Sequence, residues 1–183
     1  MSEQGGRYQR SFSGMIGAMI VMVALVVAFV VVRGLNRNDP SIDPERVDYL
    51  DVVRGVARAG GDPVAYPPEL PDGWFATSAA FGVEGIWSLS LLTDEEHFVG
   101  VRQSRTADSV DDLVTTYVDD AAEEGDPVTL DSPLADTWRS FTDSGGDYAL
   151  VAEVEDSTVL GVGSAPEQEI QDLTASLTMK PPS

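Results

Sequence analysis

The chain has 183 residues with 31 acidic and 11 basic side chains, a net charge of −20, and no cysteine. This charge argues against a nucleic-acid-binding protein, because phosphate contacts need clustered Lys and Arg. The lack of cysteine excludes disulfides, thiol catalysis and cysteine-held metals, and a single histidine disfavours a Ser-His-Asp triad or a His-rich metal site. We therefore expect no nucleic-acid partner, no metal and no cofactor, and one folded domain with an accessory segment.

The accessory segment is an apolar stretch near the N-terminus. Arg10 and Arg33 are separated by 22 uncharged residues, which as a helix would extend about 33 Å, enough to cross a hydrocarbon core of about 30 Å. The stretch is longer than the apolar part of a signal peptide, and no small-x-small cleavage site follows it. We predict a basic tail at residues 1–10, an uncleaved transmembrane helix in the lipid bilayer at residues 11–33, and a linker at residues 34–44.

Charge divides sharply at this segment. Residues 1–37 carry four Arg and one Glu, a net charge of +3, whereas residues 38–183 carry 7 basic and 30 acidic side chains, a net charge of −23. Arginines flank the predicted helix on both sides, so the positive-inside rule leaves its orientation undecided. The acidic charge beyond the helix promotes solubility and opposes binding to anionic phospholipid.

Beyond the linker, the hydrophobic pattern predicts one acidic α+β domain over residues 45–180, with a single, mainly antiparallel sheet covered by helices. Apolar residues recur at helical spacing in three segments, at residues 45–59, at residues 110–121, and in a last helix that a Ser164–Glu167 capping box opens. Short alternating segments predict strands at residues 74–81, 86–92, 98–103, 128–130, 138–142, 148–154 and 158–162. We expect Asp108 or Ser109 to cap the middle helix and Gly125 to end it. The predicted core includes Trp87, Leu113, Tyr117 and Leu173.

Few residues indicate chemistry. The three tryptophans, Trp74, Trp87 and Trp138, could line a ligand groove, although large aromatic side chains on alternating strands usually belong to the core. His97 follows three acidic residues and could take part in a metal or acid–base site, but a surface hairpin loop is the better interpretation.

Two other patterns have structural interpretations that we prefer. The acidic residues between positions 111 and 124 lack the spacing of a calcium-binding loop and are typical of a solvated helix face. The Gly-Val-Gly-Ser run at residues 161–164 suggests a phosphate-binding turn, but it has no third glycine and no nearby lysine. We interpret that run as a tight turn with a helix cap.

The order of several short motifs resembles a known family. The motifs are Leu-Pro-Asp-Gly-Trp at residues 70–74, Trp87, Phe98-Val99 with Gln103, Trp138, Tyr-Ala-Leu-Val at residues 148–151, and Gly-Ser-Ala at residues 163–165. With the N-terminal span, this order resembles the actinobacterial family called domain of unknown function 4245, over roughly residues 7–178. The resemblance implies a single-pass membrane protein whose domain lies outside the cytoplasm, and it supplies no catalytic residues. The order is also similar to sheet-and-helix folds of the PsbP and Mog1 type, an analogy of fold alone.

Two classes of function remain. We expect a membrane-anchored extracytoplasmic domain that acts as a non-catalytic, envelope-associated binding module for a partner protein or a small ligand. The alternative is a membrane-anchored hydrolase built from carboxylates, for which no residue pair stands out. The family resemblance implies that the N-terminus is cytoplasmic and that residues 38–183 lie outside the cell membrane.

Overall fold

A computed structural model describes part of the chain, namely residues 44–82, 85–105 and 110–182 together with Met19, Met22 and Val26. The predicted basic tail lies outside the described residues, as does the transmembrane helix apart from those three positions and the linker apart from Pro44. Within the described part, no helix has both the length and the apolar character needed to cross a membrane. Residues Pro44–Ser183 form one compact unit.

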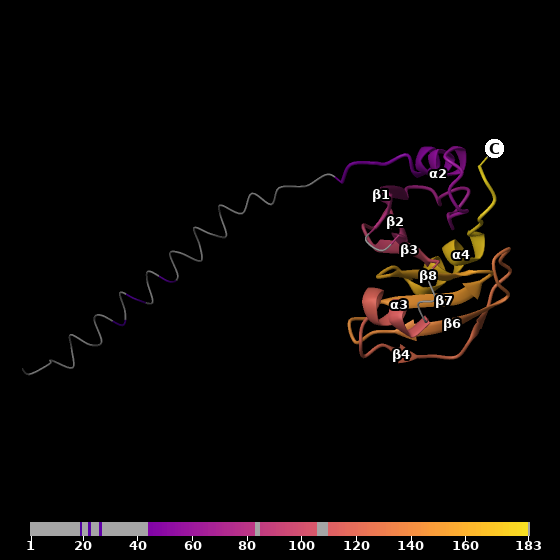
Figure 1. Cartoon of the computed structure of the whole chain (residues 1–183). Helices are drawn as coiled ribbons and strands as arrows, with labels where there is room; N and C mark the ends of the chain where they lie inside the picture. Colours follow the sequence, from indigo (N-terminus) through magenta and orange to yellow (C-terminus); the bar gives the residue numbers. More distant parts are fainter. Residues whose placement is uncertain are drawn as a thin grey trace, which may run out of the picture. The chain divides into compact units, whose positions relative to one another are not determined.

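The domain is built on one antiparallel sheet. Its strands are β1 (Phe75–Phe81), β2 (Trp87–Leu92), β3 (Phe98–Ser104), β4 (Glu123–Glu124), β5 (Val128–Thr129), β6 (Thr137–Thr142), β7 (Tyr148–Val154) and β8 (Ser157–Gly163). They are arranged in the order β1-β2-β3-β8-β7-β6-β4, which Figure 1 shows, and β5 pairs with β6 off this path. Every pair of neighbouring strands is antiparallel, so the predicted α+β class with an antiparallel sheet is confirmed.

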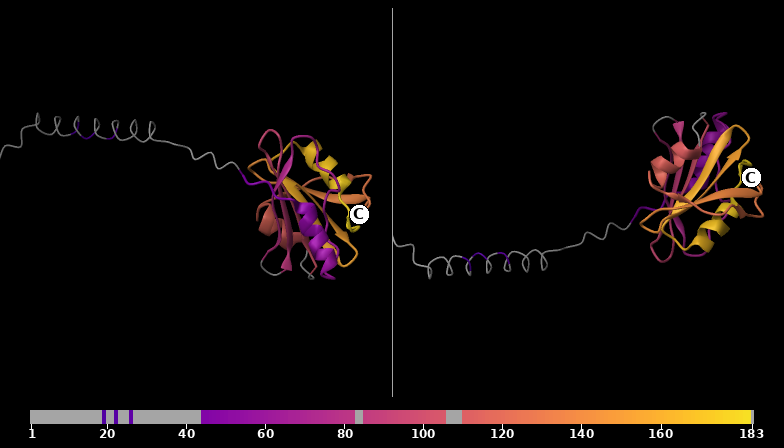
Figure 2. Two further views of the ribbon diagram at one scale, coloured as in Figure 1. Left: turned by 90° about the horizontal axis from the view of Figure 1, so that it is seen from above. Right: turned by 90° about the horizontal axis from the view of Figure 1, so that it is seen from below.

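Helices cover both faces of the sheet. The helices α2 (Tyr49–Arg58) and α4 (Glu167–Ser176) pack with one apolar cluster, and α3 (Val110–Tyr117) packs with the other. Figure 2 shows α3 and α4 on opposite sides of the sheet. Strand β7 explains how one sheet serves two clusters, because Leu150 and Ala152 belong to the first and Ala149 and Val151 to the second. Successive side chains of a strand point to opposite faces.

The predicted core is largely confirmed. Trp87, Leu113 and Leu173 are buried, at 1%, 2% and 3% exposure. Tyr117 differs, because it is only partly buried and packs at the margin of the α3 cluster. Its ring lies beside the guanidinium of Arg102, 5.4 Å from the ring centre, at the point where α3 ends.

Two helices are shorter than predicted. Helix α2 begins at Tyr49 rather than at residue 45, because the Asp48 side chain accepts a hydrogen bond from the backbone N–H of Asp51 at 3.1 Å and so caps the helix. Helix α3 ends at Tyr117 rather than continuing to residue 121, and Gly125 does not end it. The following residues leave the helix to pair with β6 as strand β4. The predicted caps of α3 lie outside the described residues.

The predicted capping box and glycine turn before α4 are wrong. The hydroxyl of Ser164 accepts a hydrogen bond from the Phe98 N–H at 3.2 Å, so it does not cap α4, whose first residue follows Pro166. Gly161 and Gly163 are inside β8. A Cβ atom at Gly163 would lie 2.2 Å from the carbonyl oxygen of Phe98, so glycine here permits close contact between strands rather than a turn.

Candidate functional site

The three tryptophans of the possible ligand groove all lie in the α2/α4 cluster of the core. Trp74, Trp87 and Trp138 are 8%, 1% and 0% exposed. The indole N–H of Trp87 donates to the carbonyl of Ala65 at 2.8 Å, and that of Trp138 donates to the carbonyl of Ala135 at 2.9 Å. None of the three tryptophans lines the grooves of the described domain that lie around Lys180 and Pro181.

A buried glutamine works with Trp87 to fix the segment that precedes Tyr66. The Gln103 side-chain oxygen accepts from the N–H of Ala65 at 2.7 Å, and its amide nitrogen donates to the carbonyl of Pro63 at 3.2 Å. Tyr66 then pairs with Thr178 through two backbone hydrogen bonds of 3.0 and 2.9 Å. The segment after α4 is therefore held against the domain by main-chain contacts.

A groove of about 520 Å³ lies between α2 and this last segment. We call it the C-terminal groove. Its lining residues are Leu50, Arg54, Tyr66, Pro68, Pro133, Ser176, Thr178, Lys180, Pro181 and Pro182. Two neighbouring hollows of about 130 and 440 Å³ share Lys180 and Pro181 with it. Four of the lining residues are prolines, whose fixed φ angle limits the conformational entropy that these positions can lose on binding.

The C-terminal groove differs in charge from the rest of the domain. Its lining contains Arg54 and Lys180, the only lysine of the chain, and no acidic residue. Arg54 makes an ion pair of 2.5 Å with Asp51, whose carboxylate is 71% exposed, and such surface pairs are weak. The lining of the groove therefore carries a net positive charge, although the domain as a whole is acidic.

Two tyrosines beside the groove act as neutral hydrogen-bond donors. The hydroxyl of Tyr66 donates to the carbonyl of Lys180 at 2.6 Å, and burial raises its pKa while Arg54 opposes that rise. The hydroxyl of Tyr49 donates to the carbonyl of Pro67 at 2.8 Å, and burial raises its pKa to about 12. Both rings thus remain uncharged at neutral pH and hold the proline-rich walls in place.

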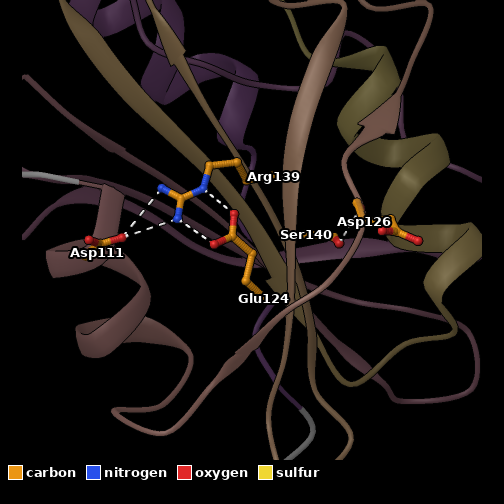
Figure 3. Close-up of polar contacts among 5 residues, drawn as sticks. All are labelled: Asp111, Glu124, Asp126, Arg139 and Ser140. Carbon is orange, nitrogen blue, oxygen red and sulfur yellow. Dashed lines mark hydrogen bonds and ion pairs between the residues drawn. The ribbon is translucent and has the colours of Figure 1, made fainter.

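A second polar cluster is centred on Arg139, and Figure 3 shows it. The Nε and Nη2 atoms of Arg139 donate to the two carboxylate oxygens of Glu124 at 2.7 and 3.0 Å, and Asp111 lies 3.5 Å away. The hydrogen bond with Arg139 lowers the pKa of Glu124 and raises the pKa of Arg139. This cluster joins β6, β4 and α3, so these two members of the predicted acidic face have a structural role.

His97 lies in the connection between β2 and β3, as the hairpin-loop interpretation predicted. Its backbone N–H donates to the hydroxyl of Thr93 at 3.0 Å, and its carbonyl accepts from the Thr93 N–H at 2.9 Å. The preceding Asp94, Glu95 and Glu96 are exposed. Across the described residues, no group of three or more histidine and acidic side chains is placed to hold a metal ion.

Sequence reasoning missed both cationic features. The C-terminal groove draws its lining from segments between residues 50 and 182, and no periodic pattern connects them. The one signal in the sequence is the scarcity of basic residues. Residues 38–183 contain only seven, so each of them is a candidate for a site that binds an acidic group.

Comparison with known proteins places the chain in a family. Residues 7–177 match the family described as "Protein of unknown function (DUF4245)". No curated relative and no solved structure matches the chain. The match spans most of the chain and agrees with the resemblance read from its motifs. The chain belongs to the DUF4245 family.

Proposed function

We propose that the chain is a membrane-anchored, non-catalytic binding module whose domain lies outside the cytoplasm, and that the C-terminal groove takes its ligand. The observation that carries the proposal is the charge of this groove. Two cations and no carboxylate line it, although acidic side chains outnumber basic ones by 30 to 7 over residues 38–183. Charge complementarity therefore favours a partner protein or small ligand that presents an acidic group.

The membrane anchor in this proposal is the uncharged stretch between Arg10 and Arg33. The family resemblance supports a cytoplasmic N-terminus and an external position for residues 38–183. Electrostatics adds a small bias in the same direction, because the acidic domain is repelled by the anionic cytoplasmic leaflet within a screening length of about 8 Å.

A binding role is better supported than the carboxylate-based hydrolase. A hydrolase of that kind needs converging carboxylates with raised pKa values in a cleft. Burial and the nearby Asp143 raise the pKa of Asp147. These two residues share a tight turn, in which the Asp147 N–H donates to the Asp143 carboxylate at 2.8 Å, and neither lines a described groove.

Site-specific photocrosslinking tests the groove. The chain has no cysteine, so one introduced cysteine can carry a crosslinker at a chosen place in the full chain in native membranes. Ser176→Cys places it in the C-terminal groove, and Ser144→Cys, exposed in the turn between β6 and β7, is the matched control. We expect a discrete adduct from position 176 that position 144 does not give.

The charge of the groove supplies a second control. Lys180→Gln, combined with Ser176→Cys, should reduce the yield of that adduct, because it removes one of the two cations in the lining. Equal adducts from the two cysteine positions, or an adduct that Lys180→Gln leaves unchanged, would contradict the assignment of the groove.

A further inference from the structure

Arg102 is a half-buried cation on the face of the sheet that α3 covers. It is part of β3, and its side chain lies beside Tyr117 at the end of α3. Its Nη1 atom donates to the carbonyls of Leu89 and Val101 at 2.8 and 3.0 Å, and its Nη2 atom reaches the hydroxyl of Ser90 at 3.4 Å. All three acceptors are neutral, so these hydrogen bonds orient the guanidinium without neutralising it.

Arg139 has a carboxylate partner, and Arg102 has none among the described residues. The Nε and Nη2 side of the Arg139 guanidinium binds both oxygens of Glu124. On Arg102 the same side has only the long contact with Ser90, and no carboxylate of the described domain forms an ion pair with it. Burial lowers the pKa of Arg102, and a partly buried charge is costly unless a counter-charge meets it.

The surroundings of Arg102 offer more than charge. The ring centres of Tyr117 and Phe98 lie 5.4 and 6.0 Å from its guanidinium carbon. Gly100 is beneath it, and a Cβ atom there would lie 3.0 Å from Nη1. Two aromatic rings therefore lie close to the cation, and the Ser90 hydroxyl, which accepts from Nη2, has its own proton to donate.

We propose that the Nε and Nη2 side of Arg102 anchors a second binding site, which takes the carboxylate or phosphate group of a ligand whose apolar part lies against Phe98 and Tyr117. A guanidinium presents two parallel donors at the spacing of two such oxygens. The site is on the opposite face of the sheet from the α2/α4 cluster, so it is independent of the C-terminal groove.

NMR of the arginine Nε–H groups tests the site in the full chain, held in non-ionic detergent. Acetate, benzoate and inorganic phosphate are titrated separately, each against sodium chloride at equal ionic strength. We expect a saturable shift of the Arg102 Nε–H signal, and none for Arg139, whose Nε already donates to Glu124. Benzoate should bind about 2- to 10-fold more tightly than acetate, because its ring meets the two aromatic side chains.

The titrations also separate the two ligand chemistries. A saturable shift with the carboxylates alone, or with phosphate alone, supports the site and names its oxyanion. No shift at Arg102, equal shifts at both arginines, or the same shift with chloride would overturn the proposal.

Two variants sharpen the test, with the Gly100 amide as a second reporter. Arg102→Lys keeps the charge but lacks the paired donors, and it should weaken binding about 10-fold or more. Ser90→Ala should weaken binding about 3- to 10-fold, as expected for one lost hydrogen bond. Unchanged affinity in the folded Arg102→Lys variant would contradict the assignment. If a variant does not fold, the difference in NMR shift between Arg102 and Arg139 in the unmodified chain still tests the site.

Discussion

Two arginines on the same face of the sheet show how an acidic domain uses its few cations. Arg139 of β6 forms ion pairs with Glu124 of β4 at 2.7 Å and with Asp111 of α3 at 3.5 Å. Arg102 donates to carbonyl and hydroxyl oxygens and lies near the rings of Phe98 and Tyr117. Arg139 has a carboxylate partner that accepts two hydrogen bonds, whereas the acceptors of Arg102 are all neutral. The net charge of the domain therefore does not show which of its cations lack a carboxylate partner among the described residues.

The largest expected effect comes from the core beneath α3, the helix beside which both arginines lie. Leu113 is 2% exposed and packs α3 onto the sheet. Leu113→Ala should lower the free energy of unfolding by about 2–5 kcal/mol, measured by urea unfolding of the full chain. A change within about 0.5 kcal/mol would mean that this side chain is not part of a packed core.

Substitution of Gly163 in β8 should affect Arg102 and not Arg139, because Gly163 lies against Phe98, whose ring is near Arg102. A Cβ atom at Gly163 would meet the Phe98 carbonyl oxygen at 2.2 Å, so Gly163→Ala should cost about 1–3 kcal/mol. The NMR signal of Arg102, which lies beside the Phe98 ring, should move, and that of Arg139 should not.

Gly55→Ala is the control, because nothing lies within 4 Å of its added methyl group in α2, and it should stabilise the domain by roughly 0.5–1 kcal/mol. Equal effects of the two substitutions would contradict the close contact.

A neutral group beside the C-terminal groove extends the comparison to alkaline pH. Tyr49→Phe removes the hydrogen bond to Pro67 and should cost about 1 kcal/mol at neutral pH. Burial raises the pKa of Tyr49 from 10.0 to about 12 in the folded chain. Its contribution is therefore complete below pH 10 and is lost as the pH rises toward 12. Unfolding free energies measured across that range should fall less steeply in the variant, and parallel curves would contradict the raised pKa.

The smallest effect concerns the pairing itself. Arg139 lowers the pKa of Glu124 below its ordinary value of 4.5. The stabilisation is therefore complete above that value and is lost as the pH falls below it. Arg139→Gln should reduce the acid dependence of stability, measured by unfolding between neutral and acidic pH. Arg102→Gln should leave the acid dependence unchanged, since no carboxylate of the described domain pairs with Arg102. Identical acid profiles for the two variants would remove the distinction between the arginines.

Local pattern predicted most of the sheet and the middle helix. The alternation of Trp87, Leu89 and Leu91 marks β2, and these side chains are buried on one face. Strand β4 could not be predicted, because its two residues are both glutamates and its pairing depends on β6 and on Arg139. The capping box at Ser164 failed for a similar reason, since contact with Phe98 replaced a local hydrogen bond.

The candidate site was harder to predict than the fold. The tryptophan pattern was compatible with either a core or a groove, and the structure places those rings in the core. The C-terminal groove joins Arg54 on α2 to Lys180 in the last segment. Backbone pairing of Tyr66 with Thr178 brings these parts together. The two residues are too far apart in the sequence for a local pattern to predict their contact.

Topology is the claim on which the proposed function depends most directly, and protease added to intact spheroplasts tests it. If the N-terminus is cytoplasmic and residues 38–183 lie outside, the protease should remove the domain without lysis. The fragment that remains should stay with the membrane and contain residues 11–33. A domain that survives on intact spheroplasts and is digested only after lysis would contradict the account.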